Sequence, residues 1–223
     1  MKNNNEGFFR RMRHAILILL AAALVSGARV CAQTGDASTG ASGAATQAKP
    51  PTEKESAKSC GEVFARDKTA APDYSIGRYD PTGGTPGPWQ TFKSAADLAT
   101  AANNAIFEDQ AWVWESNGTI VHARITMPTE SWTTVADYCF RPDGTTAEIV
   151  SDVENFAVNE IDHREWDFDN RARIRDIRQQ FLDLDTRKPR KPERDLTEVD
   201  TTIYFKAADL PFRALVQNSG AQP

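Results

Sequence analysis

Two stretches of this chain alternate apolar and polar side chains on both sides of a glycine-containing turn signal. In the first, AWVWES is followed by Asn117-Gly118 and TIVHARITM. In the second, WTTVADYCF is followed by Arg141, by Pro142-Asp143-Gly144 and by TTAEIVSDV. Successive side chains of a strand point to opposite faces of a sheet, and Asn-Gly or Asp-Gly readily adopts the positive φ angles of a tight turn. Each stretch therefore predicts a β-hairpin.

The aromatic pair that precedes the second turn recurs along the sequence. A shift of 28 residues towards the C-terminus, or of 26 towards the N-terminus, brings another aromatic-x-aromatic pair into its place. The three pairs are Trp112 and Trp114, Tyr138 and Phe140, and Trp166 and Phe168. They predict three successive hairpin units. In the third unit, residues 171–185, the apolar positions also fit a helix. We expect a strand, because a strand matches the other two units, and a helix is the alternative.

The remaining segments predict one helix and further extended structure. Ser94 followed by Asp97 resembles a helix-capping box, and the apolar residues after it recur at helical spacing. TTIYFKA, residues 201–207, predicts a last strand, and the glycine- and proline-rich segment before Ser94 predicts loops. The fold class we expect is mainly β with a minor α component. It is a single antiparallel meander sheet of six or more strands, built from aromatic-turn hairpins, with one helix and the N-terminal loops packed on one face.

Seven aromatic side chains occupy strand positions that we expect to share one face of this sheet. They are Trp112, Trp114, Trp132, Tyr138, Phe140, Trp166 and Phe168. Large aromatic side chains on one face fill a core or line the site of an apolar ligand. Alternation alone does not distinguish these two roles.

The N-terminal residues have the layout of a bacterial-type secretory signal peptide. Four basic residues precede an apolar run, residues 15–25, that is too short to span a bilayer, and a small-residue cleavage site ends at Ala32. We therefore expect residues 1–32 to be removed. The mature protein is then periplasmic or secreted by the general secretory route, and it has no membrane span.

The mature chain divides into three parts. Residues 33–58 contain no large apolar side chain and predict a disordered low-complexity tether. Residues 59–216 have the length of a single antiparallel β domain, and residues 217–223 predict a flexible tail. Removal of residues 1–32 takes away five of the 26 basic and one of the 31 acidic residues, which leaves 21 basic against 30 acidic. This acidic balance argues against nucleic acid as a partner.

Two cysteines, Cys60 and Cys139, remain after signal cleavage. In an oxidising compartment they predict one disulfide, which would close a loop of about 80 residues and stabilise the fold by about 4 kcal/mol. Cys139 lies on the strand face opposite Tyr138 and Phe140, so its partner must come from a layer that covers that face. Two separate thiols are the alternative.

Sequence signals for catalysis or for a cofactor are weak. The sequence contains no nucleophile elbow and no phosphate-binding glycine loop, so we expect no cofactor and assign no catalytic residue. His163, Glu165 and Asp167 would share one face of a strand and are weak candidates for a metal site. Ion pairs on a solvated face explain the same residues.

These features predict an exported, non-enzymatic protein of the cell envelope or the medium. We expect it to bind an envelope protein or an apolar small molecule through its β scaffold. The alternative is an envelope hydrolase that uses the carboxylates around Glu165 and Asp167. A pocket holding carboxylates of raised pKa would favour the enzyme, and an open apolar groove would favour binding.

Overall fold

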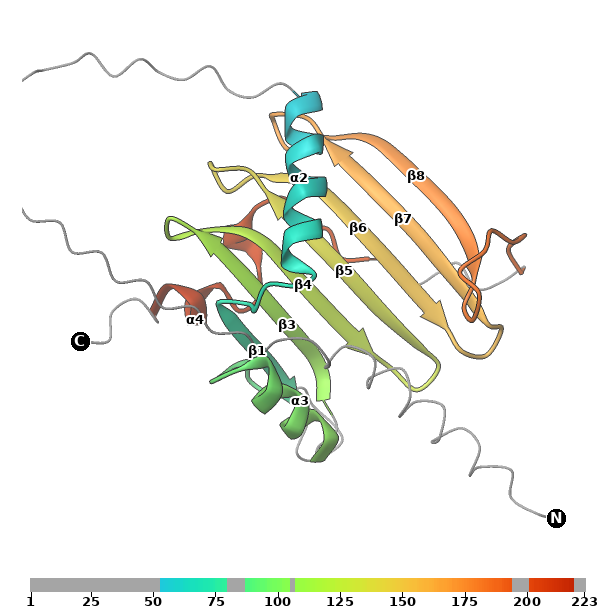
Figure 1. Cartoon of the computed structure of the whole chain (residues 1–223), viewed down its shortest axis with the longest axis horizontal. Helices are drawn as coiled ribbons and strands as arrows, with labels where there is room; N and C mark the ends of the chain where they lie inside the picture. Colours follow the sequence, from blue (N-terminus) through green and yellow to red (C-terminus); the bar gives the residue numbers. More distant parts are fainter. Residues whose placement is uncertain (1–52, 80–86, 105–106, 194–200, 219–223) are drawn as a thin grey trace, which may run out of the picture. The chain divides into compact units, whose positions relative to one another are not determined.

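An eight-stranded antiparallel sheet forms the body of the protein (Figure 1). The computed structural model describes residues 53–79, 87–104, 107–193 and 201–218, which all belong to one compact unit, residues 48–223. The order across the sheet is β2-β1-β3-β4-β5-β6-β7-β8. The strands are β1 (Tyr74–Tyr79), β2 (Gln90–Phe92), β3 (Phe107–Ser116), β4 (Thr119–Pro128), β5 (Trp132–Phe140), β6 (Thr146–Asn155), β7 (Glu160–Phe168) and β8 (Ile174–Asp183). The predicted antiparallel meander of six or more strands is confirmed.

Tight turns join the long strands at the predicted positions. Asn117 and Gly118 connect β3 to β4 with φ angles of 53° and 73°. Positive φ at both central residues is the requirement of a type I′ turn. Between β5 and β6, Gly144 has a φ angle of 80°, and Oδ1 of Asp143 accepts the N–H of Thr145 at 2.9 Å. The two hairpins read from the sequence are therefore present.

The third hairpin unit has the register of the second. Tyr138 on β5 pairs with Ile149 on β6, and Trp166 on β7 pairs with Ile177 on β8. Each residue of the second pair lies 28 positions after its counterpart, as the repeat predicts. Residues 174–183 form a strand, so the helical alternative does not hold. Pairing with β7 gives this segment the main-chain hydrogen bonds that a lone helix of its length would hold only marginally.

The strand register of the first hairpin unit differs by one residue from the register of the other two. Val113, and not Trp112, pairs with Ala123, and Ala123 pairs with Tyr138. A shift of one residue moves a side chain to the other face of a sheet. Trp112 and Trp114 therefore lie on the face opposite Tyr138, and the prediction that all seven aromatic residues share one face is wrong for these two.

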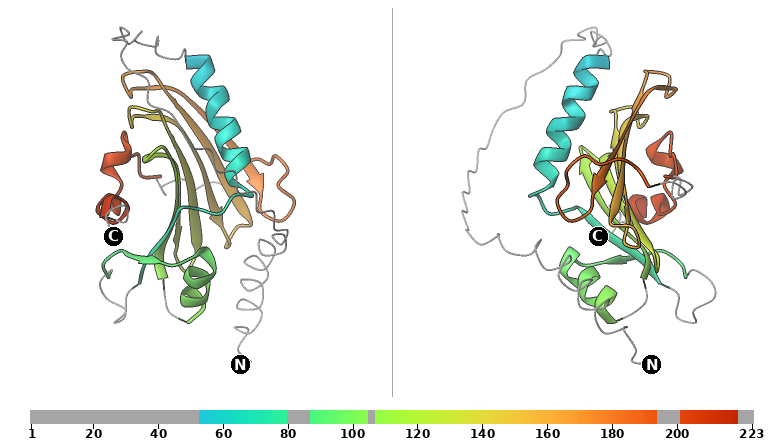
Figure 2. Two further views of the ribbon diagram at one scale, coloured as in Figure 1. Left: turned by 60° about the vertical axis from the view of Figure 1, so that its left-hand side comes forward. Right: turned by 90° about the vertical axis from the view of Figure 1, so that its right-hand side faces the viewer.

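The two faces of the sheet carry different layers (Figure 2). We call the face with Tyr138, Ile149 and Trp166 the core face, and the face with His122 and Cys139 the helix face. Helix α2 (Glu53–Asp67) packs on the helix face against β4, β5 and β6. The C-terminal segment, residues 201–218, lies on the core face. The sheet is thus the middle of three layers.

Helix α2 occupies a position for which the sequence predicted a tether and loops. Cys60, Phe64 and Asp67 recur at helical spacing and turn towards the sheet, where Cys60 is 1% and Asp67 4% exposed. The helix begins at Glu53, so residues 53–58 are helical and the predicted tether, 33–58, overlaps it. The expected signal peptide, 1–32, and the tether up to residue 52 lie outside the described residues.

The helix predicted after Ser94 is confirmed as α3 (Ala95–Asn104). Oγ of Ser94 accepts the N–H of Asp97 at 3.1 Å, which is the N-terminal half of a capping box. Leu98 is fully buried, and the helix packs against β1 and β2. No helix in the described part of the chain is both long enough and apolar enough to cross a bilayer.

The C-terminal segment covers the core face without joining the sheet as a strand. It contains a short 3-10 turn, η2 (Ala207–Asp209), and the helix α4 (Arg213–Asn218). The predicted strand 201–207 is wrong, since only Lys206 forms an isolated bridge, with Thr145. Side chains of the sheet bind the segment instead: the Tyr138 hydroxyl donates to the carbonyl of Thr202 at 2.8 Å. The predicted tail, 217–223, begins within α4, and residues 219–223 lie outside the described residues.

Cys60 and Cys139 form a disulfide between α2 and β5. Their Cα atoms are 5.7 Å apart, and both side chains are buried. The predicted bridge is confirmed, and so is the inference that the partner of Cys139 belongs to a layer over the helix face. That layer is a helix and not a set of loops.

Candidate functional site

The centre of the core face is packed solid. Tyr138 is 0% exposed, and its ring lies 5.5 Å from the ring of Tyr204 in the C-terminal segment. Phe212 of the same segment is 1% exposed. Burial raises the pKa of the Tyr138 hydroxyl above its usual value. This part of the aromatic face is hydrophobic core.

The seven predicted aromatic residues divide between core, edge and opposite face. Four are buried in the core, and Trp132 is half-buried on the same face. Trp112 and Trp114 lie on the helix face, where the Trp114 ring stacks on His122 with centroids 4.5 Å apart. The four buried residues are Tyr138, Phe140, Trp166 and Phe168.

An open groove lies beside this core, over β7 and β8. Its volume is about 610 Å³, and it is lined by Arg164, Trp166, Ile177, Gln179, Phe181, Thr201 and Ile203. The hydroxyls of Thr201 and Ser151 lie 2.7 Å apart, which holds the start of the C-terminal segment over β6. Ile177, on β8, is 54% exposed. The covering layer in the described residues therefore leaves part of the sheet open at β8.

The polar side chains of this groove already have partners. Asp162 is buried and accepts hydrogen bonds from Nε of Arg164 at 2.9 Å and from Nε2 of Gln179 at 2.9 Å. The pair between Arg164 and Asp162 neutralises the charge of both groups. The remaining lining is largely aromatic and aliphatic, from Trp166, Ile177, Phe181 and Ile203. A groove of this size can hold a small ligand, and these four side chains offer it apolar contacts.

The three weak metal candidates lie together on the helix face of β7. Nδ1 of His163 is 2.6 Å from Oδ1 of Asp152, and its Nε2 is 3.2 Å from Oε1 of Glu165. The hydrogen bond with Asp152 raises the pKa of His163, against the opposing effect of burial. Both ring nitrogens of His163 thus face carboxylates.

Arg178 of β8 occupies the carboxylates of Glu165 and Asp167. Its Nε donates to Oε2 of Glu165 at 2.7 Å, and its Nη1 donates to Oδ2 of Asp167 at 2.8 Å. Burial by itself would raise the pKa of Glu165, but the hydrogen bonds from Arg178 and His163 lower it. Within the described residues, no group of three His, Cys, Asp or Glu side chains is arranged to hold a metal ion. The cluster is an ion-pair network.

Glu148 is the carboxyl group of this face with the strongest perturbation. It lies on β6 directly opposite Asp167, and it is half-buried. Burial, followed by the charges of Asp167 and Glu165, raises the pKa of Glu148 to about 7. A carboxyl of that pKa can exchange a proton near neutral pH. The sequence places Glu148 on a polar strand face, but it does not show the burial and the neighbouring carboxylates that raise its pKa.

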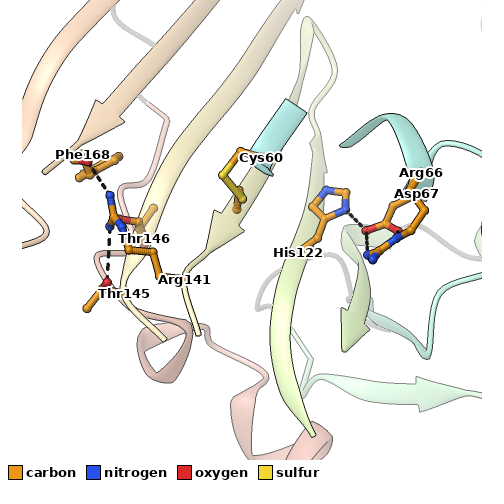
Figure 3. The surroundings of a disulfide bond; sticks show 9 residues. Cys60, Arg66, Asp67, His122, Arg141, Thr145, Thr146 and Phe168 are labelled. Carbon is orange, nitrogen blue, oxygen red and sulfur yellow. Dashed lines mark hydrogen bonds and ion pairs between the residues drawn. A yellow bond between two sulfur atoms is a disulfide. The ribbon is translucent and has the colours of Figure 1, made fainter. Parts of the chain in front are cut away.

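A second histidine cluster is buried between α2 and the sheet (Figure 3). His122, 2% exposed, places Nδ1 3.0 Å from Oδ2 of Asp67 and Nε2 2.8 Å from Oδ1 of Asp137. Carboxylate oxygens only accept, so both contacts are hydrogen bonds when both ring nitrogens carry protons. Arg66 donates to Asp67, and Arg124 donates to Asp137. The cluster fastens the end of α2 to β4 and β5, beside the disulfide.

Comparison with known proteins gives no assignment. Neither protein-family models, nor curated proteins, nor solved structures match this chain. Any statement about function therefore rests on the groove, the charged network and the sequence signals described above.

Proposed function

We propose that this protein is an exported, non-enzymatic binding protein that holds an apolar ligand in the groove over β7 and β8. The observation that carries the proposal is the groove itself. Four of its seven lining residues are apolar, it lies beside the core, and Asp162 neutralises the charge of Arg164. Its volume of about 610 Å³ is within the range of small-molecule sites.

Two further features support export. The N-terminal residues have the layout of a secretory signal peptide. The disulfide between Cys60 and Cys139 is of a kind that persists in oxidising compartments and is rare in the cytosol. An apolar ligand, whether free or part of an envelope protein, is a suitable partner in such a compartment.

A titration with the neutral fluorescent probe phenylnaphthylamine tests the proposal. The probe should bind the wild-type protein, and Ile177→Gln should weaken that binding about 10-fold, because it removes apolar contact worth roughly 1.5 kcal/mol. Phe156→Gln is the matched control, since Phe156 is an exposed apolar residue that does not line the groove. Absence of probe binding, or equal effects of the two substitutions, would contradict the proposal.

One observation favours a second candidate, a hydrolase that uses carboxylates of the helix face. Glu148 has a pKa raised to about 7 beside Glu165 and Asp167. In that case Glu148 acts as the proton donor or acceptor, and Glu148→Gln should abolish turnover of a chromogenic ester or glycoside while leaving the fold intact. The ion pairs of Arg178 with Glu165 and Asp167 make this the weaker candidate.

A further inference from the structure

The outer edge of β8 presents main-chain groups that can pair with another strand. The carbonyl of Phe181 accepts the N–H of Arg190, and the N–H of Asp183 donates to the carbonyl of Lys188, so both residues point away from β7. Main-chain direction alternates along a strand, and Ile177 and Gln179 therefore also point outward. No strand among the described residues pairs with the edge between Ile177 and Gln179.

Ile177 lies in the unpaired part of this edge. Its N–H donates to Oδ1 of its own neighbour, Asp176, at 3.0 Å, which is consistent with an outward direction. Its side chain is 54% exposed on the core face, at the outer border of the groove. A long exposed edge strand that carries apolar side chains is a template for pairing.

We propose that β8 pairs antiparallel with β8 of a second copy of this chain, about a two-fold axis through Ile177. Ile177 then lies opposite the partner's Ile177, each Ile177 N–H leaves Oδ1 of Asp176, and the two residues exchange both main-chain hydrogen bonds. In the same register, Asp176 lies opposite the partner's Arg178, and Arg178 lies opposite the partner's Asp176. A pair of unlike charges thus forms on each side of the axis.

Charge selects this register among its neighbours. Directly opposed residues of the two copies must lie on the same face of the joined sheet. The two-fold axis can therefore pass through a residue of β8 but not between two residues. An axis through Arg178 would place two arginines opposite each other, and an axis through Asp176 would place two aspartates opposite each other. Like charges in directly opposed positions destabilise a sheet, whereas unlike charges stabilise it. The self-complementary sequence Asp176-Ile177-Arg178 therefore favours a second copy over an unrelated strand.

The pairing has a consequence for the groove. The two Ile177 side chains meet on the core face, where each borders its own groove. The two grooves then adjoin across the axis, and the exposed edge of each is covered by the other copy. This inference goes beyond the proposed function and does not depend on it, because the edge hydrogen bonds and the charge pairs need no ligand.

Sedimentation equilibrium of the full chain tests the pairing. One strand pair is a small interface, so we expect a weak dimer with a Kd on the order of 10–100 μM, weakened further at high salt. Asp176→Arg should raise that Kd at least 10-fold, because it places two arginines opposite each other. Asp185→Arg is the matched control, an equal change of charge at an exposed residue beyond β8, and should dimerise like the wild type. A wild-type protein that is monomeric up to about 1 mM would overturn the proposal.

Cross-linking tests the register. In a Cys31→Ser background, Ile177→Cys should form a covalent dimer on oxidation, because Cα atoms of a hydrogen-bonded antiparallel pair are about 5.5 Å apart, within disulfide range. Phe156→Cys should not. A dimer that Ile177→Cys fails to cross-link would refute the Ile177-centred pairing. Asp176 lies on the helix face, away from the groove, so the monomeric Asp176→Arg variant should still bind the fluorescent probe. Failure of the dimer can therefore be told apart from failure of the proposed function.

Discussion

Glu148 and Asp167 lie directly opposite each other on β6 and β7, with both carboxyl groups on the helix face. Glu148 is half-buried, and Asp167 is buried and bound by Arg178. Burial disfavours the charged form of Glu148 and the Asp167 carboxylate repels it, so the fold favours Glu148 in its protonated form. The pair makes the stability of the protein depend on pH.

We predict that the wild-type protein loses stability as the pH rises through the pKa of Glu148, and that Glu148→Gln does not show this loss. The pKa of Glu148 is raised in the fold from 4.5 to about 7. A carboxyl whose pKa is raised by folding stabilises the protein fully when the pH is below its pKa in the unfolded chain. This stabilisation is lost as the pH rises through its pKa in the folded protein. The free energy of unfolding should therefore fall between pH 4.5 and about 7 in the wild type. At pH 8 the variant should be more stable by about 1–2 kcal/mol, allowing for solvent screening.

Urea denaturation across this pH range measures the effect. Glu130→Gln, at an exposed residue in the loop between β4 and β5, is the control and should follow the wild-type curve. Equal pH profiles for wild type and Glu148→Gln would show that the carboxyl is not perturbed.

We predict that loss of the disulfide destabilises the protein and releases α2. The double variant Cys60→Ala with Cys139→Ala should lose up to about 4 kcal/mol of unfolding free energy, because the bridge closes a loop of about 80 residues. Proteolysis within residues 53–67 should become faster than in the wild type, since this helix would lose its covalent attachment to β5. In protein purified from an oxidising compartment and denatured without reductant, alkylation of Cys60 and Cys139 would argue against the bridge.

We predict that aromatic residues on the two faces differ in their contribution to stability. Phe140→Ala and Trp166→Ala should each cost about 3–5 kcal/mol, because both side chains are buried in the core. Trp112→Ala should cost less than about 2 kcal/mol, because Trp112 is only half-buried and faces the helix side. Denaturant midpoints of the three variants test the assignment of faces, and a reversed order would contradict it.

We predict that the buried histidine matters more for stability than the half-exposed one. His122→Phe keeps a ring beside Trp114 but removes the hydrogen bonds to Asp67 and Asp137, and it should cost about 2–4 kcal/mol. His163→Phe removes a similar pair of contacts on a more exposed part of the sheet and should cost less than about 1 kcal/mol. Chemical denaturation at one pH compares them, and equal losses would show that burial does not set the difference.

The hairpins and the repeat could be predicted because their determinants are local. Asn117-Gly118 and Asp143-Gly144 fix turns by the φ angles that these residues tolerate, and alternation fixes the strands around them. The face of Trp112 could not be predicted in the same way. The register of β3 against β4 shifts by one residue between Trp114 and Glu115, which brings Val113 opposite Ala123 and turns Trp112 to the other face.

Helix α2 and the C-terminal segment show the opposite case. Residues 53–58 have the composition of a tether, and they are helical because Cys60, Phe64 and Asp67 bind the sheet through a disulfide, packing and a hydrogen bond. Residues 201–207 have the composition of a strand, but hydrogen bonds from Tyr138 and with Ser151 hold the segment over the core face instead. In both segments, tertiary contacts outweigh local propensity.

The sequence by itself determined the antiparallel hairpins, the helix after Ser94 and the two cysteines available for pairing, because turn residues, alternation and capping act over a few positions. Only the tertiary structure decided which aromatic residues are core, where the groove lies and which carboxyl has a raised pKa. The groove forms where Thr201 and Ile203 lie beside Trp166 and Ile177, and the raised pKa of Glu148 comes from its burial and from Asp167 on the neighbouring strand. Such properties depend on distances between residues remote in sequence, and the packing of the complete chain sets those distances.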